Sequence, residues 1–314
     1  MSRLRVCLLF GEETRHGDAI RAYGVDVVRP PAGEARSALQ DADIVVGWPG
    51  EEQLEKAERV KWIHLASAGA DPAVRSKIVR DRGIIVTNSS GVFGIPIAEH
   101  VFGLMLALSR KLHEAVESQR EGVWRRPQGP GELYGKTAGI LGLGDIGSEV
   151  AKRAKAFGMR VVAVKRRPAE RPPWVDELYG EDGIDRVVTE ADFLILCLPG
   201  TGATRRVLSR ERIWSMKAGA YVINIGRGSL IDEAALIEAL QSGRIQGAGL
   251  DVFETEPLPA ESPLWRMKNV IISPHYAGLN PHHADRSIAI FCRNLEQYLR
   301  GEPMENRVDL DEGY

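Results

Sequence analysis

The sequence predicts an α/β protein made of two domains, each a doubly wound parallel sheet. Short apolar runs, bounded by glycine, proline or asparagine, alternate along the chain with stretches in which apolar residues recur at helical spacing. That alternation is typical of parallel sheets covered by helices on both faces. The length of 314 residues is enough for two domains of ordinary size.

The first sheet is expected in the N-terminal part of the chain. Its five strands are predicted at Arg5–Phe10, Val25–Val28, Ile44–Gly47, Val60–Leu65 and Ile84–Thr87. A long helix without internal proline is predicted over Ile97–Glu121. We place the first domain boundary where that helix begins.

The second sheet follows Tyr134. Its strands are predicted at Thr137–Leu141, Arg160–Val164, Phe193–Leu198, Tyr221–Ile225, Gly247–Leu250 and Val270–Ile272. A last helix over Pro281–Arg300 stops at Gly301 and is expected to pack back on the first domain. The predicted domains are therefore residues 1–96 with 283–314, and residues 97–282.

Composition excludes several classes of protein. Lys and Arg (41) nearly balance Asp and Glu (43), giving a net charge of −2, so no basic excess favours nucleic acid as a partner. The longest apolar stretch, Val101–Leu108, is too short to span a membrane, and no secretory signal opens the chain, so we expect a cytoplasmic protein. Three scattered cysteines predict neither a disulfide framework nor a metal site.

A glycine motif joins the first strand of the second sheet to a helix. Gly142, Gly144 and Gly147, with Asp145 and Ile146 inside the motif, lie between a strand pattern and a helix pattern. In that context the spacing predicts a dinucleotide-binding Rossmann domain. Gly142 would allow a tight turn, Gly144 close approach of a pyrophosphate, and Gly147 close packing of helix and strand. A glycine-rich turn without a ligand is the alternative.

The end of the next strand carries positive charge. A carboxylate there would bind the ribose of NAD, but this chain has Lys165, Arg166 and Arg167 instead. Ammonium and guanidinium groups pair well with phosphate, so we expect NADP(H) to be favoured over NAD(H). The alternative is a solvated basic loop, in keeping with the prolines at 168, 172 and 173.

Three polar segments follow predicted strands in the second domain. Arg227 stands between two glycines, Glu256 precedes a proline, and His275 follows the last strand. Ligands of open α/β sheets bind at the carboxyl ends of strands, where all three residues are expected. A single histidine at a strand end is more often structural, but the three together indicate catalysis on a carboxylate substrate.

The chain resembles the D-isomer-specific 2-hydroxyacid dehydrogenases over most of residues 60–314. The resemblance lies in Gly142–Gly147, Ala98-Glu99-His100, Asn224–Asp232, Leu250–Leu258, Pro263-Leu264-Trp265 and Ser273–Gly278, in matching order and spacing. It implies a flavodoxin-like substrate domain smaller than the Rossmann domain, no metal, and a homodimer formed through the long helix and the Trp124–Tyr134 loop.

The resemblance also implies roles for residues. Arg227 would bind the carboxylate and carbonyl of a 2-oxo acid, His275 would exchange the proton, and Glu256 would orient His275. Backbone amides of Ala68 and Gly69 would complete the substrate site, and Asp251 would contact the nicotinamide. Further cofactor contacts are expected at Leu198, Pro199, Thr204, Ile225 and Gly226, although the family's usual Thr-Pro pair is absent after Pro199.

Simpler interpretations apply to other polar residues. Asp71 and Asp232 are expected to cap helices that begin at Pro72 and after Asp232. The remaining histidines are expected at the surface (His16, His113), within a strand (His64), on the long helix (His100) and at a helix start (His282, His283). For His282 and His283, lining the substrate pocket is the alternative.

The sequence therefore predicts a reductase of small 2-oxo acids, with glyoxylate and hydroxypyruvate as first candidates and the D-2-hydroxy acid as product. Two alternatives stay open. One is a dinucleotide-sensing binding or corepressor module. The other is a related dehydrogenase of another small anion, such as formate or phosphite.

Overall fold

The computed structural model describes residues 3–31, 35–167 and 170–313. The chain forms two compact units, Met1–Val92 with Asn280–Tyr314 (the first unit) and Phe93–Leu279 (the second unit). The boundaries predicted from the sequence, after residues 96 and 282, fall a few residues later.

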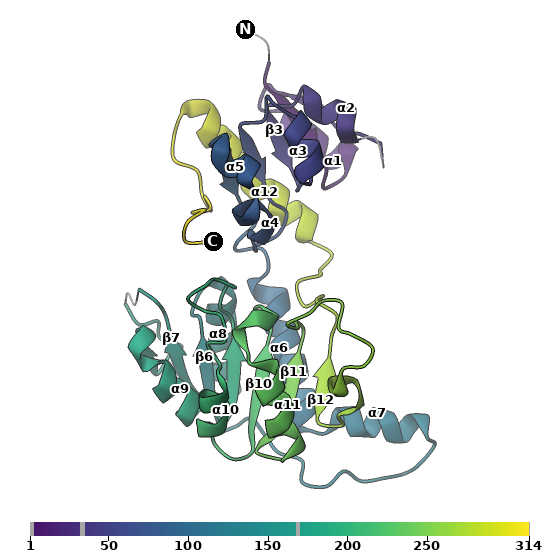
Figure 1. Ribbon diagram of the computed structural model, residues 1–314, viewed down its shortest axis with the longest axis vertical. Helices are drawn as coiled ribbons and strands as arrows, with labels where there is room; N and C mark the ends of the chain where they lie inside the picture. Colours follow the sequence, from purple (N-terminus) through teal and green to yellow (C-terminus); the bar gives the residue numbers. More distant parts are fainter. Residues whose placement is uncertain (1–2, 32–34, 168–169, 314) are drawn as a thin grey trace. The chain divides into compact units, whose positions relative to one another are not determined.

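The first unit, purple and blue in Figure 1 with the yellow helix α12, contains a five-stranded parallel sheet in the order β2-β1-β3-β4-β5. This order is that of flavodoxin-like folds, as predicted. The strands are β1 Arg5–Leu8, β2 Asp26–Val28, β3 Ile44–Val46, β4 Trp62–His64 and β5 Ile85–Thr87. Its helices are α1 Glu13–Arg21, α2 Ala35–Gln40, α3 Glu51–Lys56, α4 Asp71–Arg75, α5 Lys77–Asp81 and α12 His283–Arg300. All five predicted strands are confirmed, each somewhat shorter than expected.

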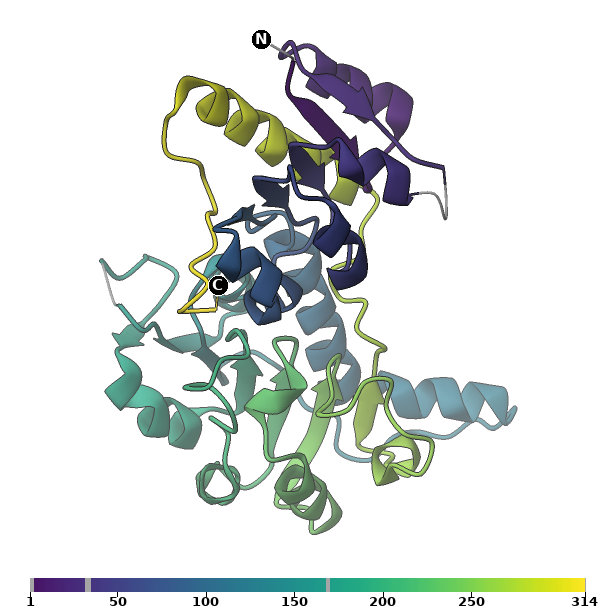
Figure 2. The ribbon, with the colours of Figure 1, turned by 45° about the horizontal axis from the view of Figure 1, so that its top comes forward.

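The C-terminal helix α12 completes the core of the first unit. Ile288, Phe291 and Leu295 are buried with residues of β1, β3 and β4, and the rings of Phe291 and Trp62 stack with centroids 5.0 Å apart. Figure 2 shows α12, in yellow, beside the purple and blue N-terminal elements. The predicted return of the chain to its first domain is thus confirmed. The helix ends at Gly301, whose φ of 70° requires the left-handed conformation that glycine adopts readily.

Two expectations about the first unit are wrong. Asp71 does not cap α4: Ala70 is the N-cap residue, and Asp71 is the first residue of the helix itself. His16 is not at the surface but only 4% exposed, because its Nδ1 accepts from the backbone of Glu12 (2.7 Å) and its Nε2 lies 2.9 Å from Asp285 on α12.

The second unit contains a seven-stranded parallel sheet in the order β12-β11-β10-β9-β6-β7-β8. The strands are β6 Thr137–Leu141, β7 Arg160–Val164, β8 Glu177–Tyr179, β9 Phe193–Leu196, β10 Ala220–Asn224, β11 Ile245–Leu250 and β12 Val270–Ile272. Helices α8 Asp145–Ala156, α9 Ile184–Glu190, α10 Arg210–Ser215 and α11 Glu233–Gln241 follow strands of this sheet, with short 3₁₀ helices at Glu181–Gly183, Gly228–Leu230 and Pro263–Arg266. Asp232 caps α11 by accepting from Ala235 N–H, as predicted.

Strand β8 was not predicted. It has three half-buried residues at the edge of the sheet, with no apolar run to mark it. Its Glu177 forms ion pairs with Arg160 on β7 and Arg186 on α9. Polar pairing of this kind is frequent at sheet edges, where one side of a strand meets water.

The predicted helix over Ile97–Glu121 is two helices, α6 Gly94–Ser109 and α7 Leu112–Arg120. They are separated at Lys111, which has a φ of 57° in the left-handed region. No glycine or proline marks this break. Helix α6 packs against α8 and β11, and a Cβ on Gly249 of β11 would lie 2.9 Å from Cβ of Leu104 on α6. Gly249 therefore permits the close approach of helix and sheet.

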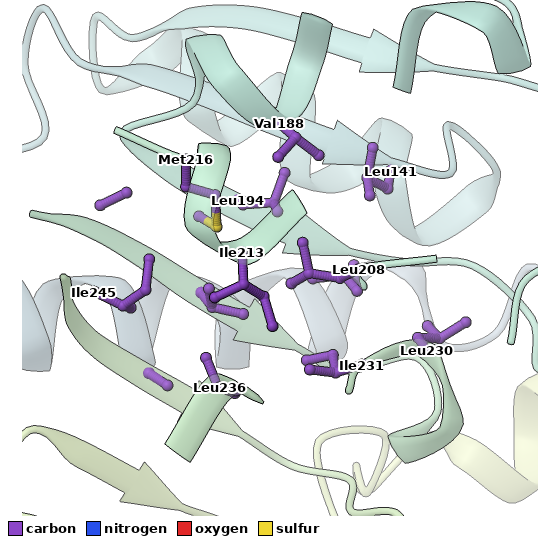
Figure 3. Packing of buried hydrophobic residues seen from close by; sticks show 14 of the residues in the cluster. Leu141, Val188, Leu194, Leu208, Ile213, Met216, Leu230, Ile231, Leu236 and Ile245 are labelled. Carbon is purple, nitrogen blue, oxygen red and sulfur yellow. The ribbon is translucent and has the colours of Figure 1, made fainter. Parts of the chain in front are cut away.

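The opposite face of the sheet packs against α9, α10 and α11. Figure 3 shows the buried cluster, with Leu141 and Leu194 from strands beside Val188, Ile213 and Leu236 from helices. This packing fixes the strands whose carboxyl ends carry the candidate site.

A polar network lies inside the first unit around His64, which has no exposed surface. Its Nδ1 is 2.8 Å from Thr87 Oγ1, which also accepts from Trp62 Nε1 at 2.9 Å. Its Nε2 lies 3.3 Å from Ser89 Oγ, whose own proton goes to the carbonyl of Leu65. These bonds suit a neutral imidazole with the proton on Nε2. Burial lowers the pKa of His64 from 6.5 to about 4.

Acid should therefore destabilise the first unit. Between pH 6.5 and 4 the unfolded chain binds a proton at His64 that the folded chain does not, so the free energy of unfolding falls as the pH falls. The expected slope is about 1.4 kcal/mol per pH unit from this residue. Urea unfolding across this range measures it. His64→Gln should reduce the slope, whereas the control His282→Gln, at an exposed histidine, should not. Equal slopes in wild type and His64→Gln would contradict the prediction.

Candidate active site

The glycine motif turns the chain from β6 into α8. Gly142 has a φ of 102°, the conformation that its predicted tight turn needs. A Cβ on Gly147 would lie 2.1 Å from the Gly142 carbonyl oxygen, so only glycine allows helix and strand to approach this closely. At Gly144 a Cβ would meet nothing within 4 Å, and this N-cap residue has no side chain to bond the first amides of α8. The loop thus leaves open space at the positive end of a helix, which fits a pyrophosphate.

The other motif residues lie in the first turn of α8. Asp145 is the first helical residue, and burial is the main cause that raises its pKa. Asp145 lies against the start of α6, where a Cβ on Gly94 would be 2.6 Å from its Oδ2. Ile146 is half-buried. Asp145 thus links the glycine motif to the start of α6.

The basic segment follows β7 and adjoins the glycine motif. Lys165, Arg166 and Arg167 are exposed, and the backbone of Lys165 donates to the Tyr179 carbonyl on β8. The amides of Gly142 and Leu143 donate to the carbonyl of Val164, at 3.1 and 3.0 Å. The three cations therefore come directly after Val164, whose carbonyl holds the glycine turn. Pro168, which supported the alternative of a solvated loop, lies outside the described residues.

The segment after β9 closes on itself. Thr204 Oγ1 donates to the Pro199 carbonyl at 2.6 Å and accepts from the amide of Thr201 at 2.8 Å. Leu198 is half-buried next to the glycine motif, since its Cδ2 would be 3.1 Å from a Cβ on Gly142. A hydroxyl from Thr204 thus shapes this loop in the absence of the Thr-Pro pair.

Arg227 follows β10 between two glycines that have a packing role. A Cβ on Gly226 would lie 2.7 Å from the Leu198 carbonyl oxygen, and one on Gly228 only 1.8 Å from the backbone carbon of Phe253. These glycines let the neighbouring loops approach closely. Arg227 is half-buried, and its Nη1 donates to the Gly226 carbonyl at 2.7 Å. Its guanidinium is thereby held beside its own turn.

Asn224, which the sequence did not single out, supports that turn. Its Oδ1 accepts from the amide of Gly226 (3.1 Å) and its Nδ2 donates to the carbonyl of Arg227 (3.0 Å). The side chain is 1% exposed. In the sequence, the available signal for this role was an asparagine near the end of an apolar predicted strand. Ile225, which lies between Asn224 and Gly226 in the sequence, is buried.

Glu256 and His275 form a hydrogen-bonded pair. Glu256 Oε2 lies 2.7 Å from His275 Nδ1, and Glu256 Oε1 accepts from the amide of Phe253 at 3.0 Å. The side chains are 35% and 52% exposed, respectively. With Nδ1 bound to a carboxylate, the opposite nitrogen, Nε2, is the one suited to exchange a proton with a substrate.

Asp251, directly after β11, is only 2% exposed. Its Oδ1 accepts from Ser273 Oγ (2.6 Å) and from the amide of Tyr276 (3.1 Å), and its Oδ2 accepts from the amide of Ala277 (3.1 Å). Ser273 and its further partner His100 were not predicted as site residues. The carboxylate of Asp251 thus anchors the segment that carries His275, and its contact with a nicotinamide remains a prediction.

The predicted site residues fall into two groups. Those of the second unit lie together at the carboxyl ends of its strands, because the strands are parallel and each residue follows the end of its own strand. Ala68 and Gly69 belong to the first unit, in the loop after β4. There the Ala68 carbonyl accepts from Asn88 Nδ2 (2.7 Å) and the Gly69 carbonyl accepts from Ser67 Oγ (2.7 Å).

The residues that the structure describes bear on two other kinds of site, a metal centre and a membrane span. No cluster of three or more His, Cys, Asp or Glu side chains there could hold a metal ion. Among the same residues, no helix has the length and apolarity needed to cross a membrane. Burial raises the pKa of the thiols of Cys7 and Cys292 to about 11 and that of Cys197 to about 12, so these cysteines are weak nucleophiles.

Comparison with known proteins identifies the family. Residues 102–277 match the NAD binding domain of the D-isomer specific 2-hydroxyacid dehydrogenases. The chain is 36% identical to a glyoxylate reductase of Thermococcus litoralis, over 91% of this chain and 89% of the relative. It is 40% identical to a D-3-phosphoglycerate dehydrogenase of Methanocaldococcus jannaschii over 88% of this chain and 53% of the relative, so it spans about half the length of that relative.

A solved structure agrees over the whole chain. The D-isomer specific 2-hydroxyacid dehydrogenase of Xanthobacter autotrophicus, in complex with NADPH and MES, has a TM-score of 0.86 and 29% identity, covering 100% of both chains. The glycine motif, the Arg227 turn and the Glu256–His275 pair thus occur on a fold that this family shares. The chain belongs to the D-isomer-specific 2-hydroxyacid dehydrogenases, a family of NAD(P)-dependent oxidoreductases.

Proposed function

We propose that this chain reduces a small 2-oxo acid, glyoxylate or hydroxypyruvate first among them, to the D-2-hydroxy acid at the expense of NADPH. The observation that carries the proposal is the Glu256–His275 pair, with Oε2 and Nδ1 2.7 Å apart. The pair lies at the carboxyl ends of the parallel strands, where Arg227 and the glycine motif also lie. The similarity to a glyoxylate reductase supports this choice of substrate.

Each residue has a distinct task in the proposed reaction. Arg227 binds the substrate carboxylate and the carbonyl oxygen, where negative charge develops during reduction. A nicotinamide cofactor would supply the hydride that C2 of the substrate receives. His275, protonated on both nitrogens, gives its Nε2 proton to the carbonyl oxygen, and solvent returns that proton after the product leaves. In the direction of oxidation the neutral ring accepts the proton instead.

Glu256 prepares His275 for this transfer. Its Oε1 is held by the amide of Phe253, so the carboxylate cannot rotate freely, and its Oε2 fixes the imidazole through Nδ1. The carboxylate thereby fixes which nitrogen of the ring faces the substrate. The amides of Ala68 and Gly69 are further candidates for binding the substrate carboxylate, on the strength of the family resemblance alone.

The cofactor contacts follow from the chain around the glycine motif. The amides of the first turn of α8 would hold the pyrophosphate, and Gly144 leaves the room for it. Lys165, Arg166 and Arg167 would pair with the 2′-phosphate of NADP(H), which NAD(H) lacks. Leu198, Pro199, Thr204, Ile225, Gly226 and Asp251 would line the rest of the cofactor. We also propose a cytoplasmic location, since all three cysteines are free thiols.

Replacing the proton donor tests the proposed reaction. His275→Ala should lower kcat with glyoxylate or hydroxypyruvate by about 10²–10⁴-fold, because it removes the proposed proton donor. The Kd for NADPH, measured by fluorescence titration, should change little. The matched control His113→Gln replaces a histidine on α7 and should retain activity. Unchanged turnover in His275→Ala would remove this residue from the mechanism.

A panel of substrates separates the alternatives. It contains glyoxylate, hydroxypyruvate, pyruvate and 3-phosphohydroxypyruvate with NADPH, and formate and phosphite with NADP⁺. The phosphorylated acid is included because one relative is a phosphoglycerate dehydrogenase. Turnover of formate or phosphite alone would favour a dehydrogenase of another small anion. Tight nucleotide binding without any turnover would favour a dinucleotide-sensing module.

Charge reversal at Lys165 tests the cofactor preference. We expect wild type to prefer NADPH, and Lys165→Asp to lower kcat/KM for NADPH about 10–100-fold, since a charged hydrogen bond is replaced by repulsion. The ratio of kcat/KM for NADH to kcat/KM for NADPH should therefore rise. Lys268→Asp makes the same charge change before β12, at the opposite edge of the sheet, and should leave the ratio unchanged. A wild-type preference for NADH would contradict the proposal.

We propose that the chain forms a homodimer through α7 and the segment after it. Trp124 and Tyr134 are 95% and 73% exposed, and Leu112 and Val116 on α7 are also exposed. Large apolar side chains gathered on one segment are typical of a protein interface.

Sedimentation velocity tests the homodimer. Wild type should sediment at twice the mass of the chain, and the double variant Leu112→Ser, Trp124→Ser should shift toward monomer, because it removes apolar contact area. Leu299→Ser, at an exposed leucine of α12, is the control that should stay dimeric. A wild-type monomer at all concentrations would refute the proposal.

A further inference from the structure

His275 occupies an unfavourable backbone conformation. Its φ of 51° lies in the left-handed region, which residues with a side chain rarely adopt. This conformation persists in a structure only when surrounding contacts hold it. The contacts that hold the segment 273–277 therefore decide where the imidazole of His275 points.

Asp251 supplies most of these contacts. Its backbone carbonyl accepts from the amide of His275 at 2.9 Å, and its carboxylate accepts from the next two amides, those of Tyr276 and Ala277. Three successive amides thus point at one residue. The turn is built around a single buried carboxylate, and its shape depends on where that carboxylate is held.

The position of that carboxylate depends on Ser273 and His100. Ser273 Oγ has one proton, which it donates to Asp251 Oδ1 at 2.6 Å, because a carboxylate can only accept. The 2.9 Å contact between Ser273 Oγ and His100 Nε2 must then have the imidazole as donor. The ring of His100 also packs edge-on against Tyr276, with centroids 5.1 Å apart. His100 therefore contacts the turn both through a hydrogen bond and by packing.

The state of His100 agrees with this direction of donation. Burial is the main cause that lowers the pKa of His100, so at neutral pH its imidazole is neutral with one proton to give. The proton is placed on Nε2 by the acceptor that Ser273 provides. A rigid helix, α6, thus supplies a fixed donor to the turn.

We infer that His100 is a positioning residue for His275, acting through Ser273 and Asp251. This inference rests on the proposed role of His275 as proton donor. His100 does not exchange a proton with the substrate; it fixes the hydroxyl of Ser273, which fixes the carboxylate around which the His275 turn folds. His275 is thereby aimed at Glu256 without any direct contact with His100.

Four variants test the chain of contacts. His100→Leu and Ser273→Ala each remove one hydrogen-bonding group, whereas His100→Gln and Ser273→Thr keep a donor and a hydroxyl at similar places. Cofactor binding and the unfolding midpoint identify any variant that misfolds. The comparison within each pair then separates the hydrogen bond from the volume of the side chain.

The first measurement does not depend on activity. Two-bond ¹H–¹⁵N correlations of histidine-labelled protein, at a pH where the imidazoles are neutral, report which ring nitrogen of His275 carries the proton. His275→Ala identifies its signal among the seven histidines. Wild type, His100→Gln and Ser273→Thr should have the proton on Nδ1, facing Glu256. In His100→Leu and Ser273→Ala it should move toward Nε2, as in free histidine.

The second measurement is kinetic. His100→Leu and Ser273→Ala should lower kcat about tenfold, as small displacements of a proton donor do, with little change in KM for NADPH. His100→Gln and Ser273→Thr should restore most of kcat. In the His275→Ala background, His100→Leu should cause no further loss, because its effect passes through the missing residue.

Three results would overturn the inference: an unchanged His275 tautomer in Ser273→Ala, equal loss in His100→Leu and His100→Gln, or an additive loss in the His275→Ala background. Failure of the proposed function looks different. In that case no 2-oxo acid is turned over by wild type, while the tautomer measurement still decides whether His100 positions His275.

Discussion

The buried carboxylate of Asp251 is the constraint on which the arrangement of the candidate site depends. It lies directly after β11, and its hydrogen bonds reach across to the segment after β12 and, through Ser273, to His100 on α6. A charge with 2% exposure is tolerated only when its oxygens are satisfied by donors. Because all three donors belong to the segment after β12, satisfying the charge fixes that segment against the end of β11. The left-handed conformation of His275 is a consequence of this arrangement.

After the other strands, the loops are positioned by close approach of one backbone segment to another, which glycines permit. Gly147 and Gly228 occupy places where a Cβ would lie within about 2 Å of neighbouring backbone, and Gly226 is nearly as crowded. These contacts hold the loops after β6, β9, β10 and β11 at fixed distances from one another. Gly144 is different, since no atom lies near its missing side chain. Gly147, Gly226 and Gly228 therefore allow close packing of the backbone, whereas Gly144 leaves open space beside the helix start.

The sequence predicted the elements that have strong apolar patterns and missed those held by other forces. Most of the eleven expected strands were marked by short apolar runs, and all eleven formed close to their predicted places. Strand β8 has no such run and is held at the sheet edge by ion pairs. The break at Lys111 has no local signal, since neither glycine nor proline is present. Within the site, strand-end arginine, glutamate and histidine were visible, but Ser273 and His100 were not, because hydrogen bonding between residues distant in sequence leaves no spacing pattern.

The site combines exposed reactive groups with buried groups that hold them. Glu256 and His275 retain a third to a half of their surface, as groups that must meet a substrate require, whereas Asn224, Asp251 and Ser273 have almost none. Asn224 and Asp251 bond to backbone amides or carbonyls of a turn rather than to the reactive side chain itself, and Ser273 holds the carboxylate of Asp251. Turn shape, set by buried polar groups, therefore decides side-chain direction, and the reactive groups can keep their contact with solvent.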